Sequence, residues 1–432
     1  MISRYLAAFL SCLLVFALAG CGKSGGGSST QIRIVNTVPD APAISVIVGS
    51  TTVVNNLAFQ GLTQYSGVDS GTQEFKVSAN GGTSNAIDTM LNLNSNASYT
   101  YVVFNPVSST QALLVVDSGI AQSASGTFSF RVINVASGIG PVDVYLTPPG
   151  TDINSTSPTA STVPVASLSA ILTPNAGSLE LRITSAGTKD VIFDTPAQNF
   201  VSQDAYQIVI YSVGSGRLVN VAFLNIDNAG TGQVENNLLA EYKVLNASQV
   251  ASPLNVLVDG TLQLSNVPYA GVSNYVVANA GSRTFTVQAT ATPGANLLTL
   301  VDNLAPASDT SIVLNGPAGA LVGTVLNDNN LPPAAGRARI RFVNSSPDLG
   351  PVDVYVNFSK QVSGLTTNAA SAYVEVTADI NLGTAYEFDF NLAGTTTPVL
   401  KLPNTTVIGG HTYSIYLIGL AAGLQGVVVK DD

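Results

Sequence analysis

The sequence predicts an all-β protein, a tandem array of four antiparallel Ig-like β-sandwich domains after a signal peptide and flexible tether. Three observations predict this fold class. Only 10% of the residues are charged and 39 are glycine, with almost no helix-favouring Glu-Lys-Leu periodicity, as in extracellular β proteins. Short stretches alternate between apolar and polar residues, which places every second side chain on one face of a strand. The same order of stretches recurs four times.

The first residues have the character of an export signal. Arg4 is followed by an apolar run from Tyr5 to Leu18, and small residues precede Cys21. A membrane-spanning helix needs about 20 apolar residues, so this shorter run indicates a signal peptide over residues 1–20 that is removed.

The tetrapeptide at 18–21, Leu-Ala-Gly-Cys, resembles the lipobox of bacterial lipoproteins. The resemblance implies that the Cys21 thiol is diacylated (palmitate being a typical chain) and that the new amino terminus is acylated, which anchors the protein to a membrane. Residues 21–30 comprise this cysteine and a Gly/Ser-rich tether that behaves as a flexible coil. Gly22 and Lys23 lack the aspartate that resembles an inner-membrane retention signal, so we expect the outer membrane in a Gram-negative host. The alternative is an ordinary secretory peptide with an incidental cysteine.

Cysteine content and charge limit how the remaining chain can be stabilised and which partners it can bind. Cys12 lies inside the signal, so the mature chain retains one cysteine, the lipidated one, and forms no internal disulfide. Stability must therefore come from hydrophobic cores, which the 46% of apolar residues allow. The net charge of −10 makes nucleic acid an unsuitable partner.

Four segments open alike, with one cation, apolar residues and a final asparagine, and each predicts an edge-like strand. Arg33 and Lys243 lie 210 positions apart, as do Arg131 and Arg341, which indicates that a two-domain module was duplicated whole. The predicted sandwich domains span residues 31–125, 126–236, 237–335 and 336–432.

Further signals recur within the units. A glycine precedes a later alternating strand in each unit and predicts a turn with positive φ. A tyrosine begins the next strand in three units, a position typical of a tyrosine corner, whereas the third unit has Thr310 or Ser311 there. The glycines are Gly71, Gly177, Gly281 and Gly383, and the tyrosines are Tyr99, Tyr206 and Tyr413.

Together these motifs resemble the DUF4397 family of bacterial exported proteins. The resemblance covers nearly all of residues 31–430 and is strongest in units two and four, where Pro-Val-Asp-Val-Tyr occurs at 141–145 and 351–355. Units one and three depart from this motif, with Ser45-Val46-Ile47 and Asn255-Val256-Leu257. The family has no established activity, so the resemblance implies the fold and leaves the function open.

The residues that could carry catalysis are few. His411 is the single histidine, so a Ser-His-acid triad would have to use it, but no nucleophile elbow surrounds it and a solvated turn residue is the favoured interpretation. One histidine and no free cysteine exclude the usual zinc, copper and haem ligand sets. We therefore expect no catalytic residue, no metal and no cofactor, with a hydrolase site between repeats as a distant alternative.

Acids cluster after the last strand of each unit and offer two interpretations. They could hold Ca²⁺ between domains, but the dense Asp-x-Asp-x-Asp spacing of a tight site is missing, so solvation of the linkers is favoured. These acids are Asp117, Asp227, Asp328, Asp431 and Asp432.

The alternating pairs Asp143 with Tyr145 and Asp353 with Tyr355 face away from the predicted cores and are possible ligand-facing residues, or only keep one sheet face polar. We predict a non-enzymatic, lipid-anchored cell-envelope protein whose domain row acts as a surface spacer or interaction module for other envelope proteins or extracellular polysaccharide. The alternative is a carbohydrate-binding surface protein, since 15 tyrosines could stack on sugars, although tryptophan is absent.

Overall fold

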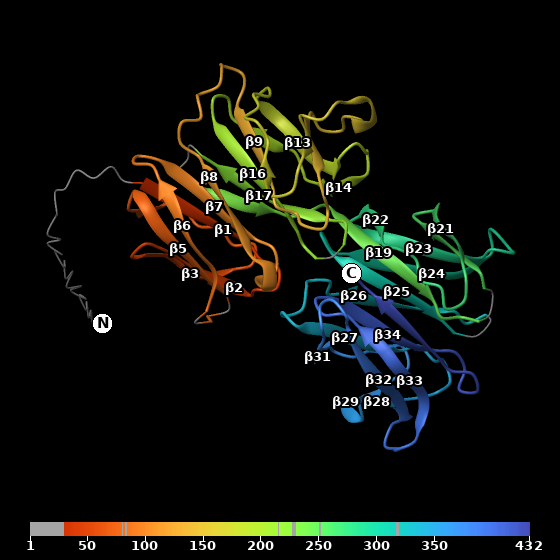
Figure 1. The fold of residues 1–432 in the computed structure, drawn as a ribbon. Helices are drawn as coiled ribbons and strands as arrows, with labels where there is room; N and C mark the ends of the chain where they lie inside the picture. The colour runs from red at the N-terminus through yellow and green to blue at the C-terminus, as the bar shows by residue number, and fades with distance from the viewer. Residues whose placement is uncertain are drawn as a thin grey trace, which may run out of the picture.

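The computed structural model describes residues 30–79, 81, 82, 84–214, 216–226, 230–249, 252–316 and 319–432. The predicted signal peptide, Cys21 and the tether up to residue 29 lie outside the described residues. The chain forms four β-sandwiches, each made of two sheets, so the predicted all-β tandem fold is confirmed (Figure 1). Among the described residues, no helix has both the length and the apolar character to span a bilayer.

Domain 1 consists of two four-stranded sheets, ordered β4-β1-β7-β8 and β3-β2-β5-β6. Its elements are β1 (Thr30–Thr37), β2 (Ala43–Val48), β3 (Thr51–Ala58), β4 (Ser66–Val68), β5 (Gly71–Ala79), β6 (Asn85–Leu93), β7 (Ser98–Phe104), the 3₁₀ turn η1 (Val107–Ser109) and β8 (Gln111–Val116).

Domain 2 has a sheet β12-β9-β16-β17-β18 and a sheet β11-β10-β13-β14, in which β15 also pairs with β13. Its elements are β9 (Ser129–Asn134), β10 (Val142–Thr147), the 3₁₀ turn η2 (Ile153–Ser155), β11 (Ala160–Val163), β12 (Ser167–Leu168), β13 (Gly177–Ser185), β14 (Val191–Asp194), β15 (Gln198–Phe200), β16 (Ala205–Ser212), β17 (Val219–Asn225) and β18 (Gly232–Glu235).

Domain 3 repeats the plan of domain 1, with sheets β22-β19-β25-β26 and β21-β20-β23-β24. Its strands are β19 (Leu239–Asn246), β20 (Leu254–Val258), β21 (Thr261–Val267), β22 (Val276–Asn279), β23 (Gly281–Ala289), β24 (Asn296–Leu304), β25 (Asp309–Asn315) and β26 (Val322–Asp328).

Domain 4 has a sheet β30-β27-β34-β35, in which β31 also pairs with β27, and a sheet β29-β28-β32-β33. Its strands are β27 (Arg337–Asn344), β28 (Val352–Val356), β29 (Ser359–Leu365), β30 (Ala369–Ala370), β31 (Val374–Thr377), β32 (Thr384–Leu392), β33 (Pro398–Val407), β34 (Thr412–Ile418) and β35 (Gln425–Lys430).

The opening strand of each domain lies inside its sheet, so the prediction that it is edge-like is wrong. β1 pairs antiparallel with β4 on one side and parallel with β7 on the other. β9, β19 and β27 make the same parallel pairing with β16, β25 and β34. Each otherwise antiparallel sandwich therefore contains one parallel pair, and its cation-bearing strand is buried on both faces.

The glycine and tyrosine signals are confirmed in the backbone geometry. Gly71, Gly177, Gly281 and Gly383 have φ values of +92°, +135°, +97° and +71°. The hydroxyl oxygens of Tyr99, Tyr206 and Tyr413 accept hydrogen bonds from the backbone N–H five residues upstream, at 2.8, 3.2 and 2.9 Å. A tyrosine corner therefore closes domains 1, 2 and 4.

Domain 1 allows a matched test of this corner. Tyr99→Phe removes the hydrogen bond to Asn94 N–H and is expected to lower the free energy of unfolding by about 1–2 kcal/mol. Tyr101 is equally buried, but its hydroxyl has no hydrogen-bond partner, so Tyr101→Phe is expected to be neutral or stabilising. Chemical denaturation of both variants checks this difference, and equal losses would contradict the corner assignment.

The asparagine that ends each opening strand joins three segments of its own domain. Its Oδ1 accepts a hydrogen bond from the N–H two residues later, and its Nδ2 donates to a backbone carbonyl of the following hairpin. In domain 1, Asn36 receives Val38 N–H at 3.0 Å and donates to Leu57 O at 2.9 Å, and Asn134, Asn246 and Asn344 do the same. The asparagine of the opening motif is therefore structural.

The four domains are packed in two pairs rather than strung in a simple row (Figure 1). One apolar cluster joins the β1 sheet of domain 1 to the β9 sheet of domain 2, and another joins the β19 sheet of domain 3 to the β27 sheet of domain 4. Val35 and Ile133 both belong to the first cluster, and Leu245 and Val343 both belong to the second. Each pair is thus a stack of four sheets.

Candidate functional site: two buried charge centres and a cleft between domains 2, 3 and 4

The cations of the opening strands lie in the interfaces between paired domains. Arg33 of domain 1 is 0% exposed, and its Nη1 donates to Asn225 O of domain 2 at 3.0 Å. Arg131 of domain 2 reaches back and donates from Nη2 to Val116 O of domain 1 at 2.9 Å. Both guanidinium groups face Asp117, at 3.6 and 3.3 Å. We call these residues the first charge centre.

Polar side chains complete the hydrogen bonding of Asp117. Thr100 Oγ1 accepts from Arg33 Nε at 2.7 Å and donates to Asp117 at 2.5 Å. Gln207 Nε2 and the Tyr65 hydroxyl donate to the same carboxylate at 2.8 and 2.7 Å. Burial lowers the pKa of Arg33 and of Arg131, and the charge of Asp117 opposes that shift. One carboxylate therefore serves two buried cations from different domains.

The second charge centre lies between domains 3 and 4 and contains two cations and two acids. Arg341 Nη2 lies 2.7 Å from Asp328 Oδ1, and Lys243 Nζ lies 2.5 Å from Asp431 Oδ1. Ser311 and Ser414 donate to Asp328 and Asp431, as Thr100 does in the first centre. Burial lowers the pKa of Arg341, but the charge of Asp328 together with Tyr416, Tyr373 and Asp431 outweighs burial, so the pKa of this guanidinium is raised.

The two centres correct the interpretation of the acids at the ends of the domains. Asp117 and Asp431 are 1% and 4% exposed, and the Asp328 side chain is fully buried, so linker solvation is wrong for these three residues. Each is buried because it neutralises a cation brought by the partner domain. Asp227 lies outside the described residues.

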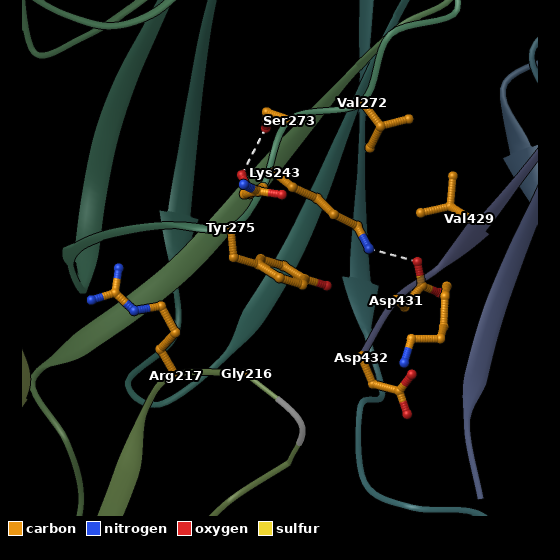
Figure 2. A pocket seen from close by; sticks show the side chains of 11 residues that line it. Gly216, Arg217, Lys243, Val272, Ser273, Tyr275, Val429, Asp431 and Asp432 are labelled. Atoms are coloured by element: carbon orange, nitrogen blue, oxygen red, sulfur yellow. Dashed lines mark hydrogen bonds and ion pairs between the residues drawn. The ribbon is translucent and has the colours of Figure 1, made fainter. Parts of the chain in front are cut away.

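A cleft opens beside the second charge centre, where domains 2, 3 and 4 meet (Figure 2). Its volume is about 620 Å³, and its lining includes Arg217 of domain 2, Lys243 and Tyr275 of domain 3, and Asp431 and Asp432 of domain 4. Figure 2 shows Lys243 extending past the Tyr275 ring toward Asp431, and its Nζ lies 4.6 Å from the ring centre.

A second pair of acids lies next to this cleft, on the face of domain 3 that meets domain 2. Glu241 is 0% exposed, and its Oε2 accepts a hydrogen bond from Arg217 N–H at 3.0 Å. Burial and the neighbouring Asp309 carboxylate raise the pKa of Glu241 to about 7. Burial raises the pKa of Asp309 to about 6, although Asn330 Nδ2 donates to it at 2.7 Å. Sequence reasoning missed this pair.

The predicted ligand-facing residues have partners inside their own domains. Asp143 is 5% exposed and accepts hydrogen bonds from the N–H groups of Thr162 and Gly187. Tyr145 is 1% exposed, and Lys189 lies over its ring and donates to its hydroxyl at 2.9 Å. In domain 2 the structure therefore does not support a ligand-facing role for Asp143 and Tyr145.

The equivalent pair in domain 4 is arranged in the same way. Asp353 is 1% exposed, and it accepts from Lys360 Nζ at 2.7 Å and from the N–H groups of Gly364 and Gly394. These bonds hold the pKa of Asp353 well below its usual range. Tyr355 is partly exposed beneath Lys360 Nζ, which lies 5.5 Å from its ring centre. Both acids thus act as internal anchors of hairpins.

His411 lies in the turn before β34, with 34% of its side chain exposed, and its Nδ1 lies 3.0 Å from Asp432 Oδ2. The cleft acids are also engaged, since Asp431 binds Lys243 and Ser414, and Asp432 binds His411. The cleft therefore gathers Asp431 and Asp432 from domain 4, each already paired with a basic side chain, beside the Glu241 and Asp309 carboxylates of domain 3.

Aromatic side chains are almost entirely internal. Within the described part of the chain no tyrosine is classed as exposed, and Phe358, at 74%, is the one exposed phenylalanine. The tyrosines that the sequence offers for stacking on sugars are instead used in cores, corners and charge centres.

Comparison with known proteins identifies one family, and the solved structures described next are distant from this chain. The model of a family described as "Domain of unknown function (DUF4397)" matches residues 30–145, 240–355 and 340–432. No curated protein sequence matches. The solved structure of the Bacillus anthracis TIE protein is 8% identical, with a TM-score of 0.15, over 88% of this chain and 69% of its own. A streptococcal family 41 carbohydrate-binding module that recognises α-glucan is 12% identical, with a TM-score of 0.18, over 44% of this chain and 96% of its own.

Proposed function

This chain belongs to the DUF4397 family, and from its paired domains we propose that it is a non-enzymatic structural and interaction protein of the bacterial cell envelope, anchored through Cys21. The family description supplies no activity, so the proposal rests on how the domains are joined. Its role is to hold a rigid surface away from the membrane to which its amino terminus is attached.

The observation that carries this proposal is the pairing of the domains. Each pair shares an apolar cluster and a buried charge centre, and ion pairs join the two domains: Arg131 with Asp117, Arg341 with Asp328, and Lys243 with Asp431. Domains joined by a flexible linker would instead expose these faces to solvent. Interfaces of this kind fix the positions of the two domains relative to each other, which suits a spacer with a fixed binding surface.

Protein partners are favoured over glycans because the aromatic surface is small. Sugar-binding sandwiches stack pyranose rings on exposed aromatic side chains, and here Phe358 is the one exposed example among the described residues. The outer sheets instead carry scattered exposed aliphatic residues, such as Leu262 at 53% and Val301 at 63%.

Two measurements test the proposed function. The full chain is expected to fractionate with membranes and to take up labelled palmitate, whereas Cys21→Ser is expected to be released and unlabelled. The soluble form, residues 30–432, is expected to enrich a defined envelope protein in a crosslinking pull-down and to show no saturable binding to envelope polysaccharides. Saturable glycan binding would replace the proposal with the carbohydrate-binding alternative, and hydrolysis of an envelope polymer would replace it with an enzyme.

A further inference from the structure

The buried Glu241 and the half-buried Asp309 form a pair of acids on adjacent parallel strands. In the ladder between β19 and β25 the two residues are direct register partners. Carboxylates placed side by side in a sheet repel each other, and burial removes the water that would screen them. Their charge has to be offset by something that the fold holds at this place.

The other three domains show that the fold does not require acids here. The register partners at the equivalent positions are Gln31 with Ser98, Ser129 with Ala205, and Arg339 with Thr412. Two residues further along the same strands, by contrast, every domain carries a cation beside a hydroxyl or an amide. Among the four repeats the acid pair is therefore a property of domain 3 alone, on a face that domain 2 contacts through Arg217.

The loop of domain 2 packs its backbone closely against both carboxylates. A Cβ added to Gly216 would collide with Glu241 Oε2 and would lie 3.2 and 3.3 Å from Asp309 Oδ1 and Oδ2. The φ of Gly216 is not positive, so its requirement for glycine comes from this close approach and not from backbone strain. Both carboxylates thus lie close to one another, directly under the backbone of this loop.

One oxygen at this place lacks a partner. The whole of Glu241 is 0% exposed, and its Oε1 forms no hydrogen bond. A buried carboxylate oxygen without a donor is costly, and native structures rarely keep one without a bound ion, a water or a functional role.

The nearest cations are directed at other acids. The Arg217 side chain lies at the surface, 3.5 Å from Asp190. Lys243 is bound to Asp431, and the remaining polar neighbours, Asn330 and Tyr275, are uncharged. The side chains facing the pair therefore leave it short of positive charge.

We propose that Glu241 and Asp309 bind one calcium ion, which fastens the Gly216–Arg217 loop of domain 2 to domain 3. The described residues hold no group of three His, Cys, Asp or Glu side chains arranged for a metal, so backbone carbonyl oxygens and water complete the shell. Calcium accepts such irregular all-oxygen sites, whereas magnesium demands a near-ideal octahedron. The ion makes the orientation of the two domain pairs depend on calcium, which goes beyond the proposed anchoring and binding role.

Calcium titration of residues 30–432, stripped with EDTA, tests the site. The expected result is one Ca²⁺ per chain with a Kd of about 10⁻⁴ to 10⁻³ M, the range of extracellular modules, and a rise of Tm with Ca²⁺ but not with Mg²⁺. The variant E241Q/D309S carries the residue pair of domain 1, so it is expected to fold. It should melt above the wild type in EDTA, because the repulsion is removed, and should lose the response to Ca²⁺.

The control is Asp69→Asn, which removes an exposed acid from domain 1 and should leave uptake unchanged. Failure of the wild type to take up Ca²⁺ overturns the proposal and leaves a shared proton as the neutralising group. Uptake that persists in E241Q/D309S places the ion elsewhere and overturns it as well. A variant that melts below the wild type in EDTA shows that the pair is not repulsive, which removes the basis of the site.

Discussion

Replacing Asp117 by asparagine is expected to lower the free energy of unfolding of the domain 1–2 pair by about 3–5 kcal/mol, the range found when a buried ion pair loses one partner. Asparagine keeps the shape of the side chain, so packing is preserved and the loss reports charge. Arg33 is fully buried and Arg131 nearly so, and Asp117 is the described acid that faces both. Neither guanidinium can shed its proton at neutral pH, so both would remain as buried charges.

Denaturant and thermal unfolding of residues 30–432 measures this loss as an earlier transition of one domain pair. The matched control is Asp69→Asn, an isosteric change at an exposed acid of the same domain, with an expected effect within about 0.5 kcal/mol. Should D117N fail to fold, the variant R33M/R131M/D117L replaces the whole centre by apolar residues and is expected to recover most of the stability. A D117N protein as stable as the wild type would mean that the ion pairs of the first charge centre make no net contribution to the free energy of unfolding.

The fold within each domain could be predicted because its signals are local. A glycine at positive φ and a tyrosine at the start of a strand impose the same geometry wherever they occur, and Gly71 and Tyr99 behave as their sequence positions predict. Alternation of apolar residues likewise identifies the face that packs inside a sandwich, as with Ile44, Val46 and Val48 in the core of domain 1.

The pairing of the domains was not predicted, because alternation alone does not say what covers the second face of a strand. Arg33 on the outer face of β1 is typical of a solvent-exposed edge, and its burial depends on Asn225 and Asp117, which are distant in sequence. A signal was nevertheless present. The residue just before each opening asparagine is apolar in all four units and points away from its own core, as Val35 and Ile133 do.

The surroundings of the candidate site residues could not be predicted for a related reason. Asp143 and Asp353 face away from the core as predicted, but backbone amides of neighbouring turns occupy their carboxylates. Glu241 and Asp309 gave no sequence signal, since they lie 68 positions apart and become neighbours only through the parallel pairing of β19 with β25. Comparing the same register across the four repeats makes the pair visible.

Replacing Leu245 by aspartate is expected to separate domains 3 and 4. Leu245 is 2% exposed and lies, with Val343, in the apolar cluster between the two domains. The carboxylate cannot stay in that cluster without a partner, and an uncompensated buried charge costs at least about 4 kcal/mol. Undocking returns it to water, so the interface is lost while the core of domain 3, formed by residues on the opposite face of β19, is retained.

Small-angle scattering and limited proteolysis of residues 30–432 distinguish this outcome from general unfolding. Undocking enlarges the radius of gyration and exposes the linker between β26 and β27, while the β-sheet circular dichroism persists. Leu262→Asp supplies the control, since Leu262 is 53% exposed on an outer strand of the same domain and tolerates the same charge. If L245D keeps the wild-type dimensions, the interface is not what orients domains 3 and 4, and the rigid-spacer role loses its main support. Expansion with intact sheets would show that the sandwiches fold independently and that domain pairing adds stability beyond that of each folded domain.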